Sequence, residues 1–201
     1  MSDKGTAKPV RGAQLHLDFA HACRGVWRLL IGRPDFARDF DLSRAGVVQS
    51  FIPALLAFAP IMLLETLVTR AEGGKTGPAL YEQIALSNLM EIAAYVGIVA
   101  LLARLLGLRR WGAYLALLNW ADLVFSLIFA GVSTLSLAGE NGLQAVRLLW
   151  LLVLWPAQIV FTWNAARRVM GADITVTILL IVLDLALSTG ADQLASLVFP
   201  S

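Results

Sequence analysis

The sequence is poor in the residues that build metal and catalytic sites. Its 201 residues include one cysteine, Cys23, and two histidines, His16 and His21. A single cysteine excludes an intrachain disulfide and a cysteine-based metal cluster. Two histidines leave little material for a histidine-rich metal site. We therefore expect no metal and no other cofactor.

Charged residues are also scarce, at 15% of the chain, whereas hydrophobic residues reach 58%. An average soluble domain has about 25% charged and about 45–50% apolar residues. No water-soluble fold of this length can bury so much apolar surface, so the excess is expected to face a lipid bilayer. The formal net charge of only +2 gives no support for nucleic acid as a partner.

Recognisable catalytic motifs are missing as well. We find no nucleophile elbow, no metal-binding histidine pair, no phosphate loop and no intramembrane-protease pattern. The polar N-terminal segment lacks the short apolar core of a cleavable signal peptide. We therefore predict a protein that is not an enzyme and that keeps its first apolar stretch.

Five apolar stretches each have the length, about 20 residues, that a helix needs to cross the hydrocarbon core. Short breaks with glycine and charged residues separate them, so successive helices should run antiparallel. The predicted fold is all-α, a polytopic membrane helical bundle. Residues 1–45 form an N-terminal segment and residues 46–198 the membrane domain, with helices at 46–69, 84–106, 112–137, 143–166 and 174–198.

Prolines interrupt two of these stretches. Pro53 and Pro60 lie seven residues apart in the first stretch, and Pro156 lies in the fourth. A proline cannot donate the helical hydrogen bond to the carbonyl four residues earlier, so kinks are expected at these positions.

Lysine and arginine residues indicate the orientation. They gather in the N-terminal segment, in the loop after the second stretch (residues 109–110) and in the loop after the fourth (residues 167–168). Cytoplasmic loops retain such residues, which predicts a bacterial inner-membrane protein with a cytoplasmic N-terminus and a periplasmic C-terminus. In a four-span alternative, the last stretch is re-entrant or lies on the surface, and the C-terminus is cytoplasmic.

The segment at about 14–32 has the pattern of an amphipathic helix. Two interpretations fit it: a helix lying in the cytoplasmic interface, where Arg24 and Arg28 contact lipid headgroups, or a short helix packed under the bundle. Its apolar face is formed by Leu15, Phe19, Ala22, Cys23, Val26, Leu29 and Leu30, and its polar face by Asp18, His21, Arg24 and Arg28.

Three carboxyl residues, Glu91, Asp122 and Asp184, lie well inside predicted spans. A charged residue at the centre of a membrane helix costs about 2.5–3.5 kcal/mol on insertion scales, so each needs an explanation. Asp122 shares a helix face with Asn119 and Ser126, and Asp184 lies at a similar depth on a similar stripe. If the two stripes face each other, the two carboxyls meet.

Each carboxyl has a structural and a functional interpretation. For Glu91, Arg147 enters the fourth stretch at comparable depth, so the two can form a structural ion pair. No basic residue lies at the depth of Asp122 and Asp184. They are the coupling site of a small transporter if they converge on a solvated cavity, or they hold helices together if neighbouring groups cap them.

Three sequence phrases, NWADLVFSL, WNAARRVMGADITVTILLIVLDLALS and FDLSRAGVVQSFIPALL, resemble a group of small, uncharacterised alphaproteobacterial inner-membrane proteins. The resemblance covers roughly residues 38–190. The five-span topology with short loops more distantly resembles the Yip1-type membrane fold. That resemblance implies a membrane-organising or partner-binding role without catalysis, and it carries over no functional residue.

Two functional hypotheses follow. The first is a non-enzymatic inner-membrane scaffold or accessory protein that binds a membrane-protein partner, or a second copy of itself, through the N-terminal helix and the cytoplasmic loops. The rival is a small proton- or cation-coupled transporter or channel that uses Asp122 and Asp184.

Overall fold

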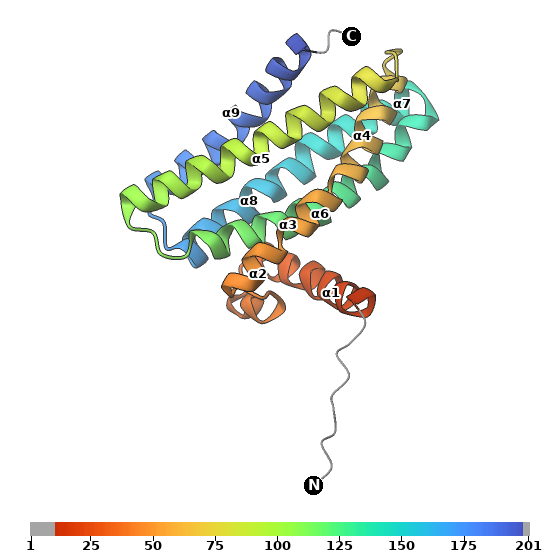
Figure 1. Ribbon diagram of the computed structural model, residues 1–201. Coiled ribbons are helices and arrows are strands. Elements are labelled where there is room, and N and C mark those ends of the chain that lie inside the picture. The colour runs from red at the N-terminus through yellow and green to blue at the C-terminus, as the bar shows by residue number, and fades with distance from the viewer. Residues whose placement is uncertain (1–10, 199–201) are drawn as a thin grey trace.

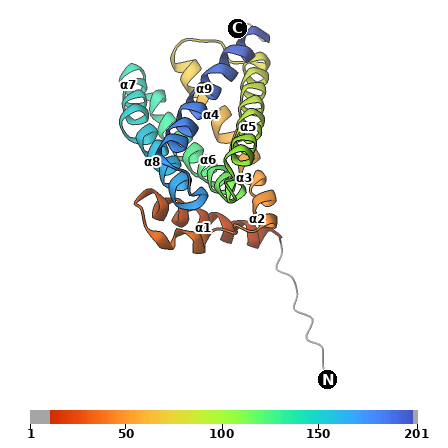
Figure 2. The same ribbon diagram turned by 90° about the vertical axis from the view of Figure 1, so that its left-hand side faces the viewer.

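The structure, a computed structural model, describes residues 11–198, with the side chains of residues 19–191 and 193–198. Residues 1–10 of the predicted N-terminal segment, and the side chains of Leu15 and Asp18, therefore lie outside the described part. Within residues 11–198 every regular element is helical and none is a strand, which confirms the all-α prediction. Long helices form a bundle, and one helix lies across its end (Figures 1 and 2).

Five helical spans are long and apolar enough to cross a membrane, so the chain is a multi-pass membrane protein. The first, Arg44–Ala71, comprises α2 (Arg44–Gln49), α3 (Phe51–Leu56) and α4 (Phe58–Ala71). The second is α5 (Pro78–Leu106), and the third comprises α6 (Trp111–Ser133) and η2 (Thr134–Ala138). The fourth comprises α7 (Glu140–Leu149), η3 (Trp150–Leu154), α8 (Trp155–Ala165) and η4 (Ala166–Met170), and the fifth is α9 (Ile174–Val198).

The fifth span was the one for which the sequence left an alternative. At 25 residues, α9 measures about 37 Å, which exceeds a hydrocarbon core of about 30 Å. Its length and composition favour five spans over the four-span alternative.

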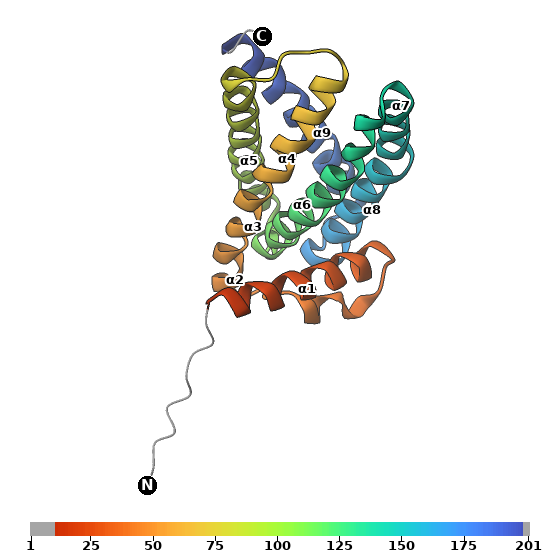
Figure 3. The same cartoon turned by 90° about the vertical axis from the view of Figure 1, so that its right-hand side faces the viewer.

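The predicted interruptions occur in both proline-containing spans. The first span breaks at Ser50 and at Ala57, each three residues before a proline, and the chain changes direction between α3 and α4 (Figure 3). In the fourth span the π-helical segment η3 ends two residues before Pro156. The missing proline N–H groups account for all three sites.

Helix α6 lies at the centre of the bundle. In its most apolar stretch, 56% of the residues are buried, against 17–28% in the other four spans. It packs against the first span, α5 and α8 as well as against the N-terminal helix. Helix α5 packs along α9, although these two helices are far apart in the sequence (Figure 1).

Helix α1 (Arg11–Leu30) lies across one end of the bundle, against α6 and α8 (Figure 2). Its apolar face is buried at Ala22, Val26 and Leu29. The side chain of Asn164 donates a hydrogen bond of 3.0 Å to the Leu29 carbonyl, and Arg168 donates one of 2.7 Å to the Gly32 carbonyl. Of the two interpretations of this segment, the structure therefore favours a helix packed under the bundle.

The polar face of α1 forms ion pairs within the protein. Arg28 ion-pairs with Asp39 at 2.8 Å and lies 3.7 Å from Asp35, so it joins α1 to the 3-10 helix η1 (Pro34–Asp39). The Arg28 guanidinium is thus engaged by carboxylates of the protein, and its predicted headgroup contact stays a prediction. Arg24 is 54% exposed and lies 4.0 Å from Asp39, and its headgroup contact stays a prediction.

Candidate functional site

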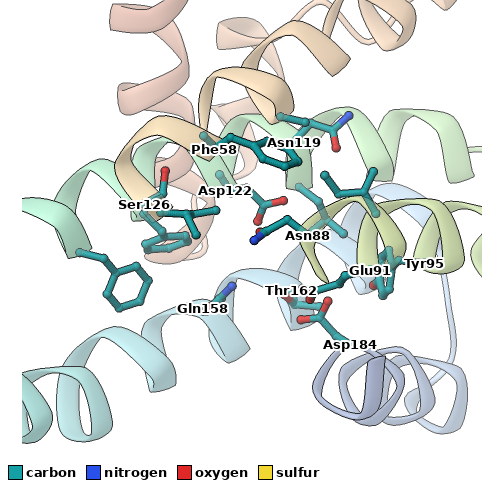
Figure 4. A pocket seen from close by; sticks show the side chains of 18 of the residues that line it. Phe58, Asn88, Glu91, Tyr95, Asn119, Asp122, Ser126, Gln158, Thr162 and Asp184 are labelled. Atoms are coloured by element: carbon teal, nitrogen blue, oxygen red, sulfur yellow. The ribbon is translucent and has the colours of Figure 1, made fainter. Parts of the chain in front are cut away.

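A cavity of about 250 Å³ lies inside the membrane domain, and all five spans contribute to its wall. Its polar lining comes from α5, α6, α8 and α9 (Figure 4). These residues are Asn88, Glu91, Tyr95, Asn119, Asp122, Ser126, Gln158, Thr162 and Asp184.

Helical spacing explains why these polar groups reach one place. Asn119, Asp122 and Ser126 are three and four residues apart, which puts them on one face of α6. Residues 88, 91 and 95 repeat this spacing on α5, and residues 158 and 162 lie one turn apart on α8. The structure thus brings together the four residues predicted as an intramembrane polar site, Asn119, Asp122, Ser126 and Asp184.

The two central carboxyls have no partner in the described part of the chain. Within residues 19–191 and 193–198, neither Asp122 nor Asp184 accepts a hydrogen bond or forms an ion pair. No lysine, arginine or histidine is among the described residues that line the cavity. Glu91 lines the same cavity as Asp122 and Asp184. The polar wall of the cavity is therefore acidic.

Thr162 adds a hydroxyl that the sequence prediction missed. Three other threonines in spans or at their ends bond a carbonyl four residues earlier: Thr66, Thr177 and Thr189. The Thr162 hydroxyl has no such bond and no other hydrogen-bond partner in the described part, although only 4% of the residue is exposed. In the described part, every side-chain oxygen or nitrogen that is completely buried has a hydrogen-bond partner. The Thr162 hydroxyl has none, so it is not completely buried and faces the cavity that Thr162 lines.

Two hydrogen-bonded contacts lie at the side of the cavity nearer α1. The hydroxyls of Tyr95 and Tyr114 are 2.6 Å apart and join α5 to α6. Asn119 donates a bond of 3.0 Å to the Ser50 hydroxyl, which in turn donates to the Val47 carbonyl at 2.7 Å. Tyr114 lies in the first turn of α6, the helix that contacts α1, and Ser50 lies between α2 and α3 near the start of the first span.

Aromatic rings form much of the remaining wall. They come from α4, α6, η3 and α8, and two of them, Phe125 and Phe161, pack edge to face with ring centres 6.0 Å apart. The phenylalanine and tryptophan residues of the wall are Phe58, Phe125, Phe129, Trp150 and Phe161.

The predicted pair of Glu91 with Arg147 is corrected. Arg147 instead donates a hydrogen bond of 2.7 Å to Glu72, just beyond the end of α4. Both side chains are exposed, because Arg147 lies only two turns into the fourth span, near the end where the loop after α4 begins. Pairing there avoids the desolvation that an ion pair inside the bilayer would require. Glu91 lines the cavity instead.

The comparisons with known proteins add no family to this description. Neither a protein-family model, nor a curated protein, nor a solved structure matches the chain. The resemblances to small alphaproteobacterial membrane proteins and to the Yip1-type fold therefore stay predictions.

Proposed function

We propose that the protein is a small proton- or cation-coupled transporter whose coupling site is the carboxyl pair Asp122 and Asp184. One observation carries the proposal: the two carboxyls line one cavity, and no described neighbour caps them. Carboxyls that only held helices together would be hydrogen-bonded to the neighbouring helix. The geometry therefore favours transport over the scaffold hypothesis that the sequence placed first.

The chemistry of the site supports exchange of a proton for a cation. A charged carboxylate in the middle of a bilayer is costly, about 2.5–3.5 kcal/mol on insertion scales, so an unpaired one is stable only with a proton, water or a cation. Because Asp122 and Asp184 line one cavity, a cation bound there can replace a proton on either carboxyl. Such replacement links cation binding to proton release.

We further propose that the protein lies in a bacterial inner membrane with residues 1–45 in the cytoplasm and the C-terminus in the periplasm. Arg109 and Arg110, together with the arginines at 167–168, lie at the end of the bundle that carries α1. Arginine at one end favours that end for the cytoplasm. In this orientation the Tyr95–Tyr114 contact lies at the cytoplasmic side of the cavity.

Proteoliposomes with a pH-sensitive dye inside test the proposal. Under an imposed pH gradient or K⁺ diffusion potential, we expect the wild-type protein to move protons faster than protein-free vesicles do. Asp122→Asn and Asp184→Asn should each reduce the rate to background. Glu82→Gln alters an exposed carboxyl outside the cavity and should leave it unchanged.

Equal rates in the wild type and both aspartate variants would refute the role of the carboxyl pair. In that case the scaffold hypothesis becomes the better one. The scaffold hypothesis predicts that purification in mild detergent, followed by mass spectrometry, recovers a stable partner or an oligomer.

A further inference from the structure

We infer that the substrate of the cavity is a small protonated aromatic amine, with one ammonium group and one aromatic ring. The inference rests on the proposed function, because it names the substrate class of the same site. Two parts of the wall carry it: the Asp184 carboxyl and the Thr162 hydroxyl, which receive no hydrogen bond in the described part of the chain, and a set of aromatic rings.

The acceptors define the position of the ammonium group. Asp184 on α9 and Thr162 on α8 turn toward the same part of the cavity as Glu91 on α5 (Figure 4). In the described part of the chain, Asp184 and the Thr162 hydroxyl have no hydrogen-bond partner. A protonated primary amine carries three N–H donors and a positive charge, and it can bond both groups at once.

The placement of the acidic groups suits an ammonium better than a metal ion. In the described part of the chain, no three histidine, cysteine, aspartate or glutamate side chains are close enough together to hold one metal ion. Asp122, Asp184 and Glu91 instead stand on three helices around the cavity. An organic cation is larger than a metal ion and can lie between these carboxyls.

The rings define the position of the rest of the substrate. Phe125 follows Asp122 by one helical turn on α6, Phe161 precedes Thr162 directly on α8, and Phe58 and Trp150 add two more rings to the wall. Aromatic faces attract a cation within about 6 Å and pack against another ring. A dry cavity of about 150 Å³ holds benzene. The cavity here, at about 250 Å³, has room for a ring with a short aminoalkyl chain.

Isothermal titration calorimetry on the purified full-length protein in detergent tests the inference with phenethylamine and 2-phenylethanol. The two probes share ring and chain length, but only the amine is charged at neutral pH. We expect the amine to bind at least about tenfold more tightly, because a charged hydrogen bond is worth about 1.5–3 kcal/mol and 1.4 kcal/mol is tenfold.

Two variants locate the ammonium group. Asp184→Asn and Thr162→Val should each weaken amine binding about tenfold, from the loss of one bond to a charged donor. Binding of 2-phenylethanol should be unchanged in both, which also reports that the cavity is intact. Thr189→Val, at an exposed hydroxyl bonded to the Leu185 carbonyl, and Glu82→Gln are the matched controls and should bind like the wild type.

Equal binding of amine and alcohol, or no binding of the amine, would overturn the inference. So would wild-type amine affinity in both Asp184→Asn and Thr162→Val. Binding and flux separate the two proposals. Proton flux that depends on Asp122 without amine binding would remove the substrate class and keep the transporter. Amine binding without any proton flux, in vesicles with phenethylamine supplied on one side, would keep the ligand and remove transport.

Discussion

Asn164 holds the C-terminal end of α1 against the membrane domain. Its side-chain nitrogen lies 3.0 Å from the Leu29 carbonyl oxygen and 3.4 Å from that of Leu30. The last carbonyls of a helix have no partner within the helix, so side chains from elsewhere often bond them. We predict that Asn164→Ala loosens α1 from the bundle without unfolding the five spans.

The structure sets the size of the effect. The Leu29 carbonyl also accepts a bond of 3.0 Å from the Gly32 N–H, so it is not left without a donor when Asn164 is truncated. The loss is therefore that of an ordinary hydrogen bond, about 1 kcal/mol. This raises the population with α1 undocked by about fivefold.

Cys23 reports this undocking directly, because it is the only cysteine of the chain and lies half-buried on the docked face of α1. Burial raises the pKa of the Cys23 thiol above its usual value. Since the thiolate is the reactive form, docking suppresses its reaction with a maleimide. Undocking exposes the thiol and returns its pKa toward normal, so the labelling rate at neutral pH should rise with the undocked population, by at most about fivefold because the half-buried thiol also reacts slowly while docked.

Asn141→Ala is the matched control, because Asn141 is an exposed residue of α7 away from α1. Its labelling rate should equal that of the wild type. An unchanged rate in Asn164→Ala, or the same increase in both variants, would refute the anchoring role of Asn164.

Two further predictions concern stability in detergent. Arg28→Ala should lower the free energy of unfolding by about 2–3 kcal/mol, below the full cost of a broken buried pair because Arg28 is partly exposed. It leaves Asp39, 5% exposed, without its 2.8 Å partner. In an Asp39→Asn background the loss should be much smaller, and equal losses would contradict the pair. Gly142→Ala should cost about 1–3 kcal/mol, because the added methyl meets the Leu135 carbonyl oxygen. Gly131→Ala meets nothing within 4 Å and should be neutral or slightly stabilising, so the reverse order in thermal unfolding would contradict this packing.

The polar groups of the cavity were predictable to different degrees. Those on α6 were found because residues 119, 122 and 126 repeat at helical spacing in an otherwise apolar stretch. Gln158 and Thr162 show the same pattern, a polar pair one helical turn apart. The pattern is weaker evidence for a site, because a threonine hydroxyl in a helix usually bonds a carbonyl of its own helix. That the Thr162 hydroxyl lacks such a bond is visible only in three dimensions.

The charged pairs show why partners are harder to predict than depth. The depth of a residue in the membrane follows from counting residues along its span. Glu91 and Arg147 lie at comparable depth by this count. Partnership depends on how each helix is rotated and on which helices are neighbours. Arg147 faces Glu72 at the exposed end of the fourth span, and Arg28 faces Asp39 below α1.

Sequence alone determined that the chain folds as five apolar helices, roughly where each lies, and where prolines interrupt them, although the second helix begins six residues earlier than predicted and the fourth span is longer at both ends. These properties depend on the thickness of the bilayer and on backbone hydrogen bonding, which act on each segment separately. Only the tertiary structure decided that α6 is central, that α5 lies along α9, and that α1 packs under the bundle. These contacts join helices far apart in the chain, and they alone bring Asp122 and Asp184 to one cavity.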